Sequence, residues 1–122
     1  PDEVYIPHPG DMQVDHRLVT EAAMVALRPK YSSKVKRIYS YETLSETGWN
    51  IPNVQNEFIP TVYEDISETM QGKLRAMSFF ESQLNEFPEA RSLGALKALA
   101  EYRGSTAGVK AAEAFCLIRE LK

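Results

Sequence analysis

The chain alternates between short segments with strand character and longer segments with helical character, and this alternation restricts the folds open to it. Residues 4–6 form an apolar run that Pro7 ends, and residues 35–41 (VKRIYSY) are rich in β-branched and aromatic side chains, so both predict strands. Between them, apolar residues recur at helical spacing from Asp15, the expected N-cap, to Leu27. Strand, helix and strand in this order favour an α/β sheet covered by helices.

The second half of the chain predicts further helices. After a long loop over residues 42–60 and an extended segment over residues 61–63, Asp65 and Glu68 have capping-box spacing and predict a helix that runs to Phe87. In the first helix, the apolar residues at helical spacing are Leu18, Ala22 and Val25, with Val19, Ala23 and Ala26 beside them. In this helix, the apolar stripe expected to form core is Met70, Leu74, Met77, Phe80, Leu84 and Phe87.

The last part of the chain predicts one more helix and leaves its final element open. Ser92 is a suitable N-cap, and Gly104 is the expected C-terminal stop. Leu93, Leu96, Leu99 and Ala100 are expected to face inward. The tail over residues 105–122 fits either a helix or a closing strand.

Composition excludes several classes of protein. A net charge of −3 gives no electrostatic footprint for nucleic acid or for an anionic membrane, and no apolar run is long enough to span a bilayer. The only cysteine, Cys116, has no partner for an internal disulfide, which predicts a reducing, cytoplasmic setting. The 122 residues suffice for one domain. Because core character begins within the first few residues, we expect a piece of a longer chain.

Both histidines of the chain lie in one segment, the run from His8 to His16, which also contains Asp11 and Asp15. The run joins the carboxyl end of a predicted strand to the amino end of a predicted helix, where open α/β sheets bind ligands. Imidazole and carboxylate groups are ligands for zinc, and a catalytic zinc site usually has three protein ligands. His8, Asp11 and His16 are one possible set. Alternatively, Asp15 is only an N-cap, Asp11 only a turn residue, and the cluster is structural.

The segment from Val4 to His16 therefore predicts a metal-binding and acid–base cluster that this chain cannot complete alone. Neighbouring residues at a helix start diverge, so Asp15 and His16 are not expected to bind one ion together. One of them is expected to be a ligand and the other to orient it. The rest of the chain offers no histidine, and Cys116 lies in an apolar run that favours a buried thiol.

The cluster and several later blocks resemble the PIG-L (LmbE-like) N-deacetylases. The blocks are collinear over nearly the whole chain, and together they make the resemblance specific. They are His8-Pro9-Gly10-Asp11, Val14-Asp15-His16-Arg17, Tyr41-Glu42-Thr43-Leu44-Ser45 with Thr47, Trp49-Asn50, Lys73 with Met77, Glu81-Ser82-Gln83, Arg91-Ser92, Arg103-Gly104-Ser105 with Gly108, and Ala112-Glu113-Ala114-Phe115.

The resemblance implies the C-terminal half of a Rossmann-like, three-layer α/β domain, with residues 1–122 as that half. The family's first block, His-Pro-Asp-Asp-Glu, carries two zinc ligands and the general base, and this chain lacks it. His16 is then implied as the third zinc ligand and Asp15 as its neighbour in the outer shell. Other members often have a histidine at the position of Gln13 that stabilises the tetrahedral intermediate. Either His8 takes that role from further back or it is filled differently.

The implied reaction is zinc-assisted hydrolysis of the N-acetyl group of an N-acetylglucosamine-type conjugate, with His8 and Asp15 as catalytic residues. Glu42, Trp49 and Arg91 are the expected sugar contacts. Alternatively, Glu42 is a solvated edge residue, Trp49 covers the core, and Arg91 pairs with a carboxylate such as Glu113. The implied partners are the missing N-terminal half and further copies in an oligomer.

Two other functions fit parts of the sequence. A sugar-binding or interaction module could keep this fold without the chemistry. A metal phosphohydrolase with a His-Asp doublet needs the opposite residue order and several more histidines, so the two histidines argue strongly against it. The presence or absence of a His-Pro-Asp-Asp block in the parent protein separates the deacetylase from the module.

Overall fold

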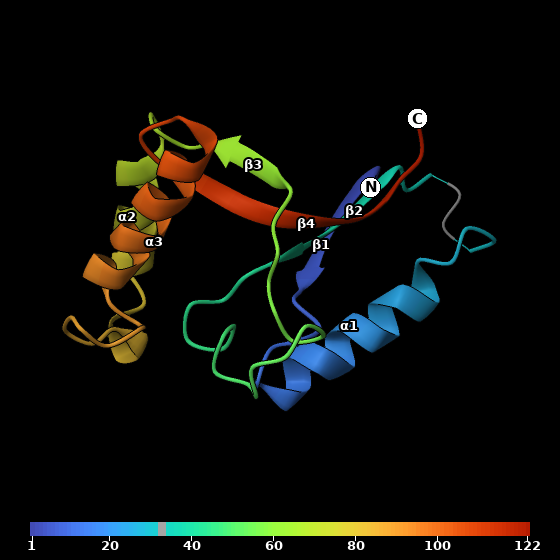
Figure 1. The fold of residues 1–122 in the computed structure, drawn as a ribbon, viewed down its shortest axis with the longest axis horizontal. Helices are drawn as coiled ribbons and strands as arrows, with labels where there is room; N and C mark the ends of the chain where they lie inside the picture. The colour runs from blue at the N-terminus through green and yellow to red at the C-terminus, as the bar shows by residue number, and fades with distance from the viewer. Residues whose placement is uncertain (32–33) are drawn as a thin grey trace. The chain divides into compact units, whose positions relative to one another are not determined.

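The computed structural model describes residues 1–31 and 34–122 (Figure 1). It contains a mixed four-stranded sheet in the order β1-β2-β4-β3. The strands are β1 (Glu3–Pro7), β2 (Arg37–Tyr41), β3 (Val62–Asp65) and β4 (Ala112–Glu120). The helices are α1 (Val14–Ala26), α2 (Met70–Ser78) and α3 (Leu93–Ala107), with a short 3₁₀ helix, η1 (Glu81–Gln83). The predicted α/β class is confirmed, and the undecided tail forms a strand.

The chain divides into two compact units. The first unit comprises residues 1–62 and 115–122, and the second unit comprises residues 63–114.

In the first unit, β1 and β2 are parallel, with Val4 opposite Ile38, and α1 is the connection between them. β2 pairs antiparallel with β4, and this ladder is irregular between Ile38 and Tyr39. Ile6 and Ile38 pack with Leu27 and Val35 in a small buried core. The carboxyl ends of β1 and β2 lie at the same edge because the two strands run in parallel, so the loops that follow them start side by side.

Helix α1 packs through a different face from the one we predicted. Leu18 and Val25 are exposed, and so is Ala22 between them. The face that meets the core instead carries Thr20 and Leu27, with the half-buried Ala23 and Met24. Both faces are largely apolar, so periodicity alone does not identify the inner one. Thr20 is inside because its hydroxyl donates to the Pro7 carbonyl over 2.8 Å.

The predicted start of α1 is also wrong. The N-cap position is Gln13, whose side chain makes no capping hydrogen bond. Asp15 lies within the first helical turn, where a negative charge stabilises the helix dipole.

In the second unit, α2 and α3 pack side by side (Figure 1). Met70 of α2 and Ala100 of α3 share a buried core with Ile66 and Ala111, and Leu74 packs against it. Ser92 caps α3 as predicted, since its hydroxyl accepts from the Ala95 N–H over 3.1 Å.

Helix α3 ends later than predicted. Gly104 lies within α3 and is buried. A Cβ at this position would lie 2.7 Å from backbone atoms of Val109 and Ala111. The helix continues to Ala107, and Gly108 ends it with a φ of 79°. Of the four residues expected to face inward, Leu93 is on the exposed side.

Helix α2 is shorter than predicted, and the capping-box prediction is wrong. Asp65 is the last residue of β3, and its carboxylate accepts from the N–H and hydroxyl of Ser67 in a turn before the helix. The helix ends at Ser78, and Phe80 and Phe87 are exposed rather than buried. The apolar spacing beyond Ser78 therefore does not correspond to a continuous buried stripe.

No helix within the described residues is long and apolar enough to cross a membrane.

Candidate functional site

The loops after β1 and β2 are joined at their starts, as the parallel pairing requires. The His8 N–H donates to the Tyr41 carbonyl over 3.1 Å, which extends the strand pairing by one bond. The chain then turns at once, because the Asp11 N–H donates back to the His8 carbonyl over 3.1 Å. The Met12 N–H reaches the Glu46 carbonyl over 3.3 Å. This geometry brings residues 8–13 against the loop that begins at Glu42.

Asp11 is the central acidic group of the site, and it is completely buried. One carboxylate oxygen, Oδ2, lies 2.8 Å from His16 Nδ1. The other, Oδ1, accepts from the Thr47 hydroxyl over 2.5 Å. A buried carboxylate is costly unless hydrogen bonds satisfy it, and here both oxygens are satisfied. Asp11 is thus a specific partner of the His16 ring.

Thr47 is held in place by its own turn. Its hydroxyl oxygen accepts from the Thr43 N–H over 2.8 Å, and its N–H donates to the Thr43 carbonyl over 2.7 Å. These two bonds close a short ring of backbone and present the hydroxyl to Asp11.

The carboxylate beside the His16 ring is that of Asp11. The ring of His16 is about a quarter exposed. The exposed Asp15 accepts from the backbone N–H of His16 over 3.1 Å. Asp11 is therefore more than a turn residue, because it takes the role of orienting the His16 ring that was expected of Asp15. Gln13, at the N-cap position, is exposed.

His8 is buried, and its ring has different partners from that of His16. Its Nε2 lies 3.0 Å from the Asn56 carbonyl, and its ring meets Phe58 edge to face at 5.2 Å between centroids. A carbonyl only accepts, so Nε2 carries a proton and donates. Nδ1 is buried and has no hydrogen-bond partner in the described part of the chain. The ring thus ties residue 8 to the far end of the loop after β2.

Gly10 allows the two loops to touch. A Cβ at this position would lie 2.5 Å from the Asn56 carbonyl oxygen and 2.6 Å from His8 Nε2, which no side chain can accommodate. The Asn50 side chain donates to the Gly10 carbonyl over 3.2 Å. Position 10 therefore requires glycine for close approach rather than for an unusual backbone angle.

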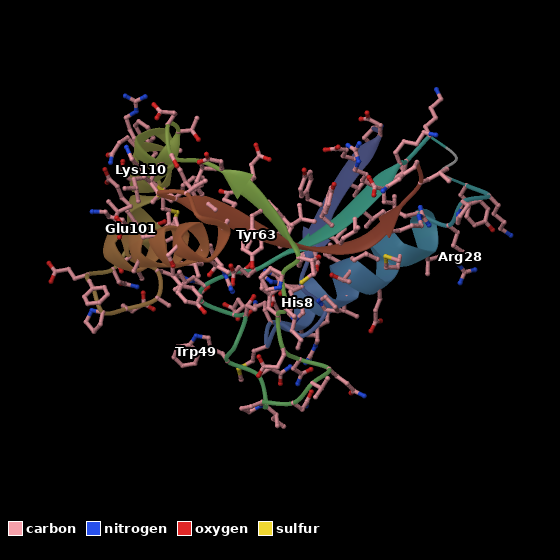
Figure 2. The ribbon with its side chains drawn as sticks, turned by 45° about the horizontal axis from the view of Figure 1, so that its top comes forward. His8, Arg28, Trp49, Tyr63, Glu101 and Lys110 are labelled. Atoms are coloured by element: carbon pink, nitrogen blue, oxygen red, sulfur yellow. The ribbon has the colours of Figure 1, made fainter. Side chains whose placement is uncertain are left out.

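The three predicted sugar contacts lie in different surroundings. Glu42 is half-buried directly after β2. Trp49 is 66% exposed and points away from its loop (Figure 2), so it does not cover the core. Arg91 belongs to the second unit, where its guanidinium donates to the Gln83 side chain over 3.1 Å. Glu113, suggested as an arginine partner, forms an ion pair with Lys73.

The suggested three-ligand set does not form. Residues 1–31 and 34–122 contain no group of three or more His, Cys, Asp or Glu side chains placed to hold a metal ion. Asp11 and His16 are paired, whereas the His8 ring is engaged by Asn56 and Phe58. The Cys116 thiol, expected to be buried, is half-buried and donates to the Ile59 carbonyl over 3.2 Å.

No role was assigned from the sequence to four partners of this site, although the first three belong to the blocks that carry the resemblance: Thr43, Thr47, Asn50 and Asn56. All four are small polar residues in the long loop after β2. The length of that loop and its position at the carboxyl edge of a parallel pair were the signals that could have singled them out.

Comparison with solved structures gives a match to the conserved protein TT1542 from Thermus thermophilus, with a TM-score of 0.72 and 22% sequence identity. The match covers 100% of this chain and 53% of that one, so the chain spans about half the length of that protein. At this identity the likeness shows the fold, in keeping with the α/β class. Searches against models of protein families and against curated protein sequences find no match.

Proposed function

We propose that this chain supplies part of the active site of a zinc-dependent N-deacetylase, with His16 as a metal ligand. The observation that carries the proposal is the contact of 2.8 Å between His16 Nδ1 and the buried Asp11 carboxylate. Histidines that bind metal usually donate their other ring N–H to such a group, which fixes the ring and strengthens the ligand. His16 Nε2 is then the nitrogen available to a metal.

The residues present fit zinc as the metal. Imidazole is a common zinc ligand, and the His16 ring is partly exposed while the carboxylate behind it is fully buried. His16 alone is one ligand of the usual three. We propose that the others come from a preceding part of the same domain, the half that carries the His-Pro-Asp-Asp block in the PIG-L-like proteins. Assembly into an oligomer is part of the same proposal.

When bound, zinc would polarise the acetyl carbonyl and make a water molecule more acidic. The residues of this chain are proposed to orient the metal ligand His16 and to supply a proton. Asp11 holds the His16 ring, and Asp15 holds the His16 backbone. His8 is proposed to take up a proton at Nδ1, its ring nitrogen without a partner among the described residues, and in that form to stabilise charge and deliver the same proton to the leaving amine. Glu42, Trp49 and Arg91 are proposed to contact the amino sugar, and Cys116 as the only cysteine is in keeping with the cytoplasm.

The test is bound zinc and acetate release from an N-acetylglucosamine conjugate, measured on the protein at its natural length. His16→Ala should lose both zinc and turnover. Asp15→Asn should keep most of the zinc, because an outer-shell group changes affinity by roughly 10- to 100-fold rather than building the site. Full activity in both variants would reject the proposal, and loss of zinc in Asp15→Asn alone would reverse the two roles.

The same measurement separates the alternative function. A protein that binds the amino-sugar conjugate but neither binds zinc nor releases acetate is a sugar-binding module of this fold.

A further inference from the structure

The polar contacts behind His16 form a chain in which the direction of each hydrogen bond can be worked out. It runs from the Thr43 N–H to the Thr47 hydroxyl, then to Asp11, and then to the His16 ring. Each step restricts the next one, because a hydroxyl has one hydrogen and a carboxylate only accepts.

The first step fixes the Thr47 hydroxyl. A backbone N–H can only donate, so the Thr47 oxygen is the acceptor in its 2.8 Å contact with Thr43. The one hydroxyl hydrogen is then free to point at Asp11 Oδ1, 2.5 Å away. Thr47 is therefore a donor to Asp11.

The second step fixes the proton between Asp11 and His16. Oδ1 is occupied by the Thr47 hydroxyl, so the contact left for Oδ2 is His16 Nδ1 at 2.8 Å. A carboxylate oxygen accepts, so the hydrogen of this contact is carried by Nδ1. The neutral ring then has its lone pair on Nε2.

We infer that Thr47 is the positioning residue of this site: through Asp11 it holds the proton of His16 on Nδ1 and leaves Nε2 as the ligand for a divalent cation. The part that concerns the cation rests on the proposed function, whereas the tautomer is a property of the metal-free chain. Thr47 contacts neither metal nor substrate in this assignment. It acts by orienting a fully buried carboxylate through a hydrogen bond.

The two histidines provide an internal contrast. His8 donates through Nε2 to the Asn56 carbonyl, so its neutral ring has the proton on Nε2. His16 has it on Nδ1. These two rings, close together in the sequence, are therefore assigned opposite tautomers. Since the chain has only two histidines, their signals can be told apart with one His16→Gln variant.

The experiment is a long-range ¹H–¹⁵N correlation spectrum of the ring nitrogens of the ¹⁵N-labelled, metal-free 122-residue chain, at about pH 8.5, which is well above the ordinary pKa of an imidazole. The expected result is Nδ1–H for His16 and Nε2–H for His8. Thr47→Val removes the hydroxyl at nearly constant shape and should convert His16 to a mixture of tautomers without changing His8. Thr47→Ser keeps the hydroxyl and should preserve the Nδ1–H form.

Zinc affinity, measured by calorimetry on the natural-length protein and on its Thr47→Val and Thr47→Ser variants, is the second readout. Thr47→Val should weaken zinc binding by roughly 10- to 100-fold, and Thr47→Ser should stay close to the parent chain. An Nε2–H tautomer at His16 in the parent chain would overturn the inference even if Thr47→Val failed to fold. So would equal behaviour of Thr47→Val and Thr47→Ser. The expected tautomers without zinc binding in any protein would support the role of Thr47 and count against the proposed function.

Discussion

The two units of this chain bury different kinds of side chain. In the first unit, buried His8, Asp11, Thr20 and Ser40 accompany a small apolar core. In the second unit, the core is aliphatic, and the buried polar residue in its described part is the helix cap Ser92. Burying a polar group costs free energy unless its hydrogen bonds are made. The first unit therefore depends on hydrogen-bond geometry and on the close approach of the loops after β1 and β2. The second depends on packing.

The largest expected effect is in the second unit, where Met70→Ala removes a residue that is 6% exposed from the packed core. We expect a loss of about 2–5 kcal/mol in the free energy of unfolding, measured by urea denaturation followed by circular dichroism. Phe79→Ala, at a position that is 79% exposed, is the control and should change stability by less than about 0.5 kcal/mol. Equal effects of the two substitutions would contradict the conclusion that packing of the buried core stabilises the second unit.

The next effect is in the first unit, where Gly10→Ala places a methyl group against the Asn56 backbone. We expect a loss of about 1–3 kcal/mol in the same denaturation experiment, because backbone must shift to admit it. Gly72→Ala is a matched control, since α2 has open space at Gly72, and it should stabilise by about 0.5–1 kcal/mol. A neutral Gly10→Ala would show that the two loops do not touch in solution.

A smaller effect is expected at the cap of α3. Ser92→Ala removes the acceptor for the Ala95 N–H and should cost about 1 kcal/mol of unfolding free energy. Ser105→Ala removes an exposed hydroxyl from the same helix and should be nearly neutral in the same assay. If the two variants have the same stability, the cap makes no contribution and packing alone sustains the second unit.

The smallest effect is electrostatic and concerns Asp65. The hydrogen bond from the Ser67 hydroxyl, and then that from its N–H, hold the pKa of the Asp65 carboxyl below its ordinary value. A lowered pKa in the folded state means that this stabilisation is present above the unfolded pKa and is lost as pH falls through the folded pKa. Ser67→Ala should raise the pKa of Asp65 toward its ordinary value, followed by NMR titration of the carboxyl carbon. An unchanged pKa would contradict the assignment to the hydroxyl.

The sequence predicted most elements of the fold, and the errors have identifiable causes. Residues 4–6 and 35–41 were recognised as strands because their runs are short, apolar and β-branched. The inner face of α1 was assigned wrongly because Leu18 and Val25 are as apolar as the residues that pack, and tertiary contacts decide between the faces. The length of α2 was overestimated because the apolar spacing continues past Ser78 although the helical backbone does not.

For the site, the sequence predicted which loop matters but not how its members pair. His8, Asp11 and His16 are close in sequence, which suggested one cluster. In space the His8 ring is held by Asn56 and the His16 ring by Asp11. Long-range partners such as Thr47 depend on how the loop after β2 folds back. The spacing of residues along the sequence does not predict this.

The turns in this loop also bear on where its length can change. Residues 43–47 form one short hydrogen-bonded ring, and residues 53–57 form another through the Asn53 carbonyl. An extra residue inside the first ring would displace the Thr47 hydroxyl from Asp11. An extra residue beside the exposed Pro52 would only lengthen the link between the rings, and loop-closure entropy rises slowly with length. Insertions and deletions among natural variants of this protein should therefore collect near Pro52 and spare residues 43–47.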